Sequence, residues 1–157
     1  MFEIEFNNAQ SLVPVDTIQL EDRLREALQR QGLTSATLSI ALVDDATIHT
    51  VNRDHLQHDY PTDVISFLYE DDKCSLDGEL VVSVETAIRE AADYGWSPEN
   101  ELMLYLVHGL LHLCGFDDQT GQQREEMRAQ ERAILQCWGL SPHYDNGAAS
   151  GAAELPE

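Results

Sequence analysis

A pair of histidines in this sequence has the spacing that metal chemistry needs. His108 and His112 are four residues apart in an apolar stretch that is typical of a helix, so both imidazoles project from one face about one turn apart. Neutral imidazole is a common zinc ligand, at Zn–N distances of about 2.0–2.1 Å. The pair therefore predicts a metal site. The alternative is a leucine-rich helix with two partly buried histidines satisfied by backbone or water.

A catalytic zinc site takes three protein ligands and leaves a fourth position for water. Gly115 is placed to end the helix just past His112, and a reversing chain could carry Asp117 or Asp118 back over the same face. An ion held in this way acidifies bound water to a pKa of about 7. The residues therefore predict a hydrolase, with the third ligand open and Asp117 also a candidate general base.

Two residues near the histidines restrict the possible reactions and the possible metal ligands. Peptidases of the HExxH type need a glutamate directly after the first histidine as general base, and Gly109 stands there. This absence weakens the hypothesis of a metallopeptidase, which stays an alternative. Cys114 points away from the pair while the helix lasts, so we interpret it as a packing residue rather than a ligand.

Length, charge and cysteines limit the classes of protein. The 157 residues and 43% hydrophobic content suit one domain, expected over 1–140, and the Gly-, Ala- and acid-rich segment 141–157 is expected to be disordered. Three cysteines without a CxxC pair suit a reducing cytoplasm, and no apolar run predicts a membrane span. The net charge of −20, from 9 Lys and Arg against 29 Asp and Glu, repels nucleic acid unless a partner compensates.

Periodicity predicts the elements that position the histidines. Alternating or β-rich runs predict strands at 2–6, 37–43, 64–69 and 79–83, with an acidic loop over 70–78. Helical spacing with capping residues predicts helices near 16–32, 44–52, 85–95, 97–115 and 120–139. The expected fold is α+β, a single domain with about four strands in a mixed sheet and about five helices, including a zincin-like metal helix.

Two blocks of sequence resemble the YbeY family of bacterial rRNA-maturation endoribonucleases. Residues 108–118, HGLLHLCGFDD, fit ten of the eleven positions of its signature H-G-x-L-H-L-x-G-[YF]-D-H. Asn52, Asp59 and PTDVISF at 61–67 resemble its N-x(6)-D-x-P-T-D-V-[LI]-S-F, and further likeness extends to Leu135 through Met127 and Glu131. The resemblance implies a metal-dependent, single-strand-specific endoribonuclease of rRNA processing and ribosome quality control, with an α+β fold and zinc as the usual ion.

The first departure from the family pattern concerns the third ligand. Asp118 stands where the family has a histidine, and a carboxylate can still bind zinc, at about 2.0–2.2 Å. The resemblance therefore implies His108, His112 and Asp118 as ligands of one divalent ion, with Zn²⁺ expected. The extra negative charge makes bound water less acidic and shifts the preference toward harder ions.

The second departure concerns phosphate binding. Leu56 stands where the family usually has an arginine, and a guanidinium can hold developing phosphate charge in a way that leucine cannot. Arg53 is the permanent cation nearby and a candidate for the substrate cleft, although an arginine on a helix is more often a solvated surface charge. His55 and His58 flank the position and would fill the role only in part.

Thr62, Asp63 and Ser66 are further candidates for the substrate cleft. The alternative is a structural role, in which Asp63 hydrogen-bonds backbone amides at the start of a strand.

The expected substrate is single-stranded rRNA. Because the chain is so acidic, a basic ribosomal protein or the small ribosomal subunit is the expected docking partner, in the cytoplasm. A metal-stabilised assembly factor with weakened catalysis is the non-enzymatic alternative.

Overall fold

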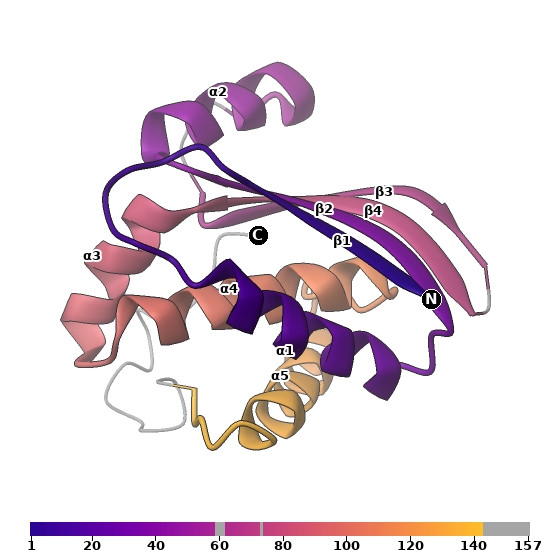
Figure 1. The fold of residues 1–157 in the computed structure, drawn as a ribbon. Coiled ribbons are helices and arrows are strands. Elements are labelled where there is room, and N and C mark those ends of the chain that lie inside the picture. Colours follow the sequence, from indigo (N-terminus) through magenta and orange to yellow (C-terminus); the bar gives the residue numbers. More distant parts are fainter. Residues whose placement is uncertain (59–61, 73, 143–157) are drawn as a thin grey trace.

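A computed structural model describes residues 1–58, 62–72 and 74–142 (Figure 1). Four strands form one mixed sheet in the order β1-β2-β4-β3: β1 (Phe2–Asn8), β2 (Ser35–Val43), β3 (Val64–Asp71) and β4 (Ser75–Ser83). β1 and β4 run parallel to β2, and the edge strand β3 runs antiparallel to β4. Five helices lie within the described ranges: α1 (Thr17–Arg30), α2 (Asp45–Leu56), α3 (Val84–Tyr94), α4 (Pro98–Leu113) and α5 (Gly121–Gln136). The predicted α+β fold is confirmed.

The predicted metal helix, α4, is the central helix of the domain. Ser97 caps its N-terminus by accepting the backbone N–H of Asn100, and Pro98 occupies the first turn, where no N–H partner is needed. Nearly every residue from Glu101 to Leu113 is buried, because α4 lies between the sheet on one side and α1, α3 and α5 on the others (Figure 1). A helix that is apolar all round in this way has to occupy the core.

The two faces of the sheet are covered unequally. The helices α1, α3, α4 and α5 lie on one face, and α2 lies on the other (Figure 1). Below α2 a small apolar cluster of Val43, Ile48, Ile65 and Val81 covers only the ends of the strands. The rest of that face is open and carries charged and hydroxyl side chains such as Glu3, which is in register with Thr37, which in turn is in register with Asp77.

The predicted acidic loop between the last two strands is shorter than expected. β3 continues to Asp71 and β4 begins at Ser75, with an irregularity between Leu68 and Glu70. Acidic residues can extend these strands because their side chains are exposed. The run of acidic residues therefore did not indicate a loop. Asp59 of the resembling block, and residues 143–157 of the segment expected to be disordered, lie outside the described residues. Among those described, no helix has the length and apolarity of a membrane span.

Candidate metal centre and its cleft

Two histidines of α4 and one aspartate beyond it converge on a single point. Asp118 Oδ2 lies 3.5 Å from His108 Nε2 and 3.6 Å from His112 Nε2, and one ligand atom from each residue falls within 4.8 Å of the others. Ligand atoms arranged tetrahedrally at zinc distances would be about 3.4 Å apart. The structure therefore brings together the three residues that the sequence predicts as ligands.

The end of α4 explains how Asp118 reaches the histidines. The helix stops at the cap residue Cys114, and Gly115 follows with φ of +103°, a left-handed conformation that glycine adopts without strain. The backbone N–H of Phe116 then donates to the Leu111 carbonyl at 3.0 Å. This reversal turns the chain back along α4, so that Asp118 faces His112 in the last turn of the helix and His108 one turn earlier.

Hydrogen bonds to the other ring nitrogens orient both imidazoles. His108 Nδ1 lies 2.6 Å from Glu131 Oε2, a buried carboxylate on α5, and His112 Nδ1 lies 3.1 Å from the Phe116 carbonyl. Both partners are acceptors, so each Nδ1 carries a proton, and each Nε2 is the atom left to bind a cation once it is deprotonated. Within the described residues both Nε2 atoms are buried without a hydrogen-bond partner. This is the arrangement that a bound cation would satisfy.

The pKa values show a site that holds a proton firmly when no cation competes for it. Burial by itself would lower the pKa of His108, but the carboxylate of Asp118, 3.5 Å from Nε2, and that of Glu131, 2.6 Å from Nδ1, outweigh it and raise the pKa to about 10. The nearby His108 imidazole also lowers the pKa of the Asp118 carboxyl, whereas burial and the charge of His108 lower the pKa of His112. A metal must therefore displace a proton from His108, which makes metal binding weaker at lower pH.

Gly109 explains why the glutamate of a zinc peptidase cannot stand beside His108. A Cβ atom at this position would lie 2.9 Å from Leu80 Cδ2 and 3.0 Å from Val64 Cγ2, so α4 packs on the sheet at closer range than any larger residue permits. Ser66 Oγ donates to the Gly109 carbonyl at 3.1 Å and ties β3 to the same turn. Position 109 faces the sheet and not the ligands, which disfavours the peptidase alternative.

A cleft of about 230 Å³ opens beside the histidines. One wall is the edge strand β3, whose alternate residues face the helices, and the other is the end of α2. The described residues that line it are Asn52, Leu56, His58, Thr62, Val64, Ile65, Ser66, Leu68, His108, His112 and Leu113. Of the candidates for the substrate cleft, Thr62 and Ser66 therefore lie in its wall.

The other candidates lie elsewhere. Arg53 is half exposed, pairs with Asp54 at 3.2 Å and is not among the residues that line the cleft. Asp63 is buried behind the wall, where its Oδ1 accepts the Val64 N–H at 2.7 Å and the Thr62 hydroxyl at 3.3 Å. Asp117 is exposed, and its Oδ1 accepts the backbone N–H of Asp118. Cys114, whose pKa burial raises to about 11, packs against the core.

Two functional contacts were missed by reasoning from the sequence. Glu131 was recognised only as part of a resembling block, although it interrupts the apolar stripe of α5 between Met127 and Ile134, and an acidic residue on a buried helix face needs a partner. Such a break in the pattern would have predicted a contact with the metal helix. Nothing in the pattern predicts that a backbone carbonyl, from Phe116, orients His112.

The fold and site define the class of this protein: a small α+β protein with a two-histidine, one-carboxylate centre on a buried helix, typical of metal-dependent hydrolases. The family model of Endoribonuclease YbeY matches residues 5–139. The chain therefore belongs to the Endoribonuclease YbeY family, whose members are hydrolases that cut RNA.

Individual relatives agree with this assignment. The chain is 48% identical over 118 residues to an Endoribonuclease YbeY of Rhodopirellula baltica, covering 74% of this chain and 61% of that relative. It is 39% identical over 156 residues to the Symbiobacterium thermophilum protein of the same name, covering 88% and 99%. The solution structure of TM1509 from Thermotoga maritima superposes with a TM-score of 0.59 at 25% identity, covering 92% of this chain and 96% of that one.

Proposed function

We propose that this chain is a metal-dependent endoribonuclease that cuts single-stranded RNA during rRNA maturation and ribosome quality control. The observation that carries the proposal is the pair of buried Nε2 atoms, on His108 and His112, directed with Asp118 at one point beside a cleft. The names of the relatives support RNA as the substrate.

We assign one divalent ion to this centre and propose Zn²⁺, because two imidazoles and one carboxylate suit it. When bound, such an ion polarises a phosphate oxygen and makes water a better nucleophile near neutral pH. The surrounding groups orient the ligands and complete the set. Glu131 fixes the tautomer and direction of His108, the Phe116 carbonyl does the same for His112, and Asp118 completes the set from the turn after α4.

The first experiment tests the centre and the activity together. Protein purified without added metal is analysed for its metal content and then assayed on a single-stranded RNA with and without a chelator. We expect cleavage that chelation abolishes and added metal restores, and a loss of metal in His112→Ala and Asp118→Ala. Unchanged metal content in Asp118→Ala would remove this carboxylate from the centre, and the absence of chelator-sensitive cleavage by metal-loaded protein would refute the proposed activity.

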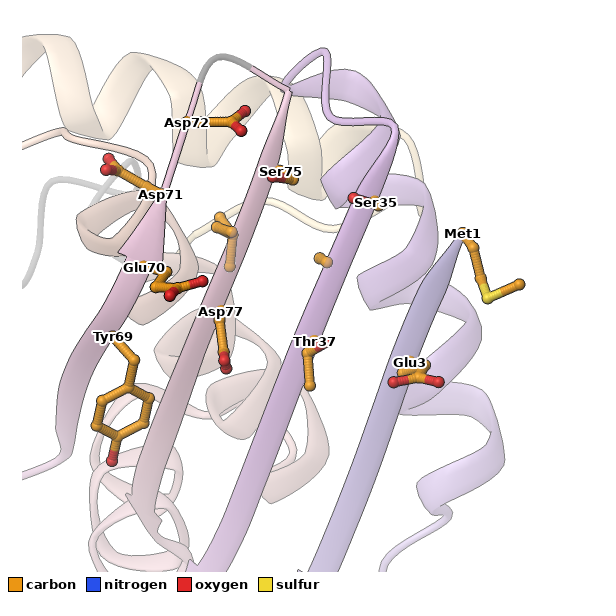
Figure 2. Close-up of a pocket in the computed structure, with 12 residues that line it drawn as sticks. Met1, Glu3, Ser35, Thr37, Tyr69, Glu70, Asp71, Asp72, Ser75 and Asp77 are labelled. Carbon is orange, nitrogen blue, oxygen red and sulfur yellow. The ribbon is translucent and has the colours of Figure 1, made fainter.

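The charge of the molecule supports a basic docking partner. The open face of the sheet forms a shallow hollow of about 810 Å³ whose lining includes Glu3, Glu70, Asp71, Asp72 and Asp77 (Figure 2). A surface of one sign attracts partners of the opposite sign and repels RNA phosphates. We therefore propose that a basic ribosomal protein of the small subunit binds this face in the cytoplasm and presents rRNA to the cleft on the other side of β3.

Comparison of two substrates tests this docking. We expect faster cleavage of rRNA in small-subunit particles than of the same RNA free in solution, and we expect Glu3→Lys with Asp77→Lys to reduce that preference. Both residues lie on the open face and outside the lining of the cleft, so cleavage of free RNA should not fall. Equal rates on the two substrates by the unaltered protein would refute the docking while leaving the nuclease activity standing.

A further inference from the structure

The cleft beside the histidines offers apolar surface to a substrate. Five of the described residues that line it are aliphatic: Leu56, Val64, Ile65, Leu68 and Leu113. Apart from its histidines, the described part of the lining contains no Lys, Arg, Asp or Glu. Its two hydroxyl groups donate within the protein, Thr62 to Asp63 at 3.3 Å and Ser66 to the Gly109 carbonyl at 3.1 Å. A group that enters the cleft therefore meets aliphatic side chains, although the molecule as a whole is strongly acidic.

Two of these leucines are far more exposed than the apolar residues of the core. Leu56 is 42% exposed and Leu68 is 46% exposed, and they are two of six large apolar residues so exposed among those described. Leu56 is the last residue of α2 and Leu68 lies on β3, so each wall of the cleft contributes one of them. Single exposed leucines are ordinary on a protein surface. Two in the walls of one concave site form a surface that a ligand can cover.

The pairing of β3 with β4 explains why Leu68 stays uncovered. Leu68 is in register with Gly78, which has no side chain to lie against it, and the register shifts directly afterwards, between Leu68 and Glu70. An irregularity of this kind adds local twist and can redirect side chains next to an active site. Leu113 of α4 packs onto Gly78, 3.0 Å from where a Cβ atom would be. The aliphatic lining thus reaches from Leu68 to the residue directly after His112.

We propose that Leu56 and Leu68 bind one unpaired base of the RNA substrate, next to the phosphodiester that is cut. This inference rests on the proposed function, because it takes RNA as the occupant of the cleft. The phosphates of an RNA strand are anionic and its riboses carry hydroxyls, whereas each base has a flat uncharged face that an apolar wall can cover. Pockets for drug-sized ligands measure about 300–1,000 Å³. A cleft of about 230 Å³ therefore suits a smaller group, such as a single base.

This contact would also help to select single strands. In a duplex each base is stacked between its neighbours, so its face is not free to cover the two leucines. In a single strand the base can turn out of the stack and enter the cleft while the backbone passes the metal centre. Leu56 and Leu68 are thus specificity residues in this proposal, and they do not take part in the reaction itself.

Two oligonucleotide probes separate base contacts from backbone contacts. The first is a fluorescent single-stranded 2′-O-methyl phosphorothioate oligonucleotide, which resists hydrolysis, and the second has the same backbone without bases. The Kd of each probe for the metal-loaded protein is measured by fluorescence anisotropy. Leu68→Ser and Leu56→Ser remove the apolar surface, and Leu68→Phe replaces it by a ring that can stack on a base. Leu12→Ser is the matched control, because Leu12 is 52% exposed but is not among the residues that line the cleft.

We expect the unaltered protein to bind the probe with bases more tightly than the probe without them. Covering the exposed half of a leucine side chain is worth about 3- to 10-fold in affinity. Each serine variant should weaken binding of the probe with bases by about that factor and change binding of the other probe by less than about 2-fold. Leu68→Phe should bind the probe with bases at least as tightly as the unaltered protein, and Leu12→Ser should change neither Kd.

A leucine that only maintains the shape of the cleft would affect both probes alike. An equal loss for the two probes in Leu68→Ser would therefore overturn the inference, and so would equal binding of both probes, or binding of neither, by the unaltered protein. Cleavage of single-stranded RNA is assayed separately. If the unaltered protein prefers the probe with bases but cuts no RNA, the proposed activity fails and the base contact stands. If it cuts RNA without that preference, only this inference fails.

Discussion

The two faces of the sheet place very different demands on their residues. On the face that α4 covers, helix and sheet pack at contact distance, as the spacing around Gly109 and Gly78 shows, and on this side of the molecule the carboxylates of Asp63, Glu101 and Glu131 are buried. On the open face, acidic and hydroxyl side chains stand in solvent with no helix over them (Figure 2). The candidate metal centre therefore lies where packing and desolvation fix each side chain, whereas the exposed acidic residues lie where they do not. We expect substitutions on the α4 face to change stability or metal affinity more than substitutions on the open face.

The largest effect on stability is expected at Asp63, the buried carboxyl behind the cleft wall. Burial, opposed by the charge of His108 and by hydrogen bonds, raises the pKa of Asp63 from 3.8 to about 6. The unfolded chain loses this proton first as pH rises, so the free energy of unfolding falls between pH 4 and 6 and stays lower above that range. A difference of about two units corresponds to about 3 kcal/mol.

Asp63→Asn should remove this pH dependence, because an amide resembles the protonated acid and can still accept the Val64 N–H. Urea unfolding of metal-free protein at pH 4 and pH 8 measures it, without an ion that would favour the carboxylate. The variant should match the parent at pH 4 and exceed its stability at pH 8. Asp77→Asn, on the open face, is the control, and a similar change in pH dependence there would show that burial is not the cause.

The next effect is expected in metal affinity at Glu131. Partners that orient a ligand histidine are worth about 10- to 100-fold in metal affinity. Glu131→Ala should therefore weaken binding by that factor, and Glu131→Gln by less, because the amide oxygen still accepts from His108 Nδ1. Competition with a chelating dye measures the affinity directly, independently of any cleavage.

The matched control for Glu131 is Glu101→Gln, which alters another buried carboxylate of the same layer. Glu101 is a buried residue of α4, and burial of the Tyr105 phenol together with the charge of Glu101 raises the pKa of Tyr105. We expect it to change stability with little change in metal affinity. An equal loss of affinity in both variants would mean that Glu131 acts through general packing and not through His108.

A smaller effect is expected at Gly109, where the backbone of α4 meets the sheet. Alanine favours a helix by about 1 kcal/mol over glycine, but a new Cβ would press on Leu80 and Val64, and overpacking costs about 1–3 kcal/mol. Gly109→Ala should therefore lower the free energy of unfolding by about 1 kcal/mol net. Thermal unfolding of metal-free protein tests this, and an increase in stability would show that the core relaxes around the methyl group.

Sequence reasoning succeeded where a local signal has one physical meaning. The caps at Ser97 and Thr120, the spacing of the two histidines and the glycine stop at Gly115 each specify backbone geometry, and all were found where predicted. The run of β-branched and aromatic residues at 64–69 likewise predicted the strand β3, although its acidic end was taken for a loop.

Long-range contacts were the part that local patterns could not supply. Nothing in the residues around His108 indicates that a carboxylate 23 positions later touches its Nδ1, because that contact depends on how α5 crosses α4. The same holds for His55 and His58. His55 and His58 flank Leu56, one residue before it and two residues after it, yet only His58, which follows the left-handed turn at Gln57, is among the described residues that line the cleft.

The smallest effect on stability is expected on the open face of the sheet. Glu3 and Asp77 lie on either side of Thr37 in one cross-strand row, which places their strands about 10 Å apart. That distance is close to the screening length at 0.1 M salt, so their repulsion is weak but present. Since the chain carries a net charge of −20, Asp77→Lys should be neutral or slightly stabilising, by less than about 0.5 kcal/mol.

Urea unfolding at low and at high salt separates charge from packing at this position. Any gain from Asp77→Lys should disappear at about 1 M salt, where the screening length is near 3 Å. Thr37→Val, which removes the hydroxyl between the two acids without changing charge, is the control and should show no salt dependence of its effect. A loss above about 1 kcal/mol at both salt concentrations would contradict the comparison, because it would mean that the open face is held by specific contacts as the α4 face is.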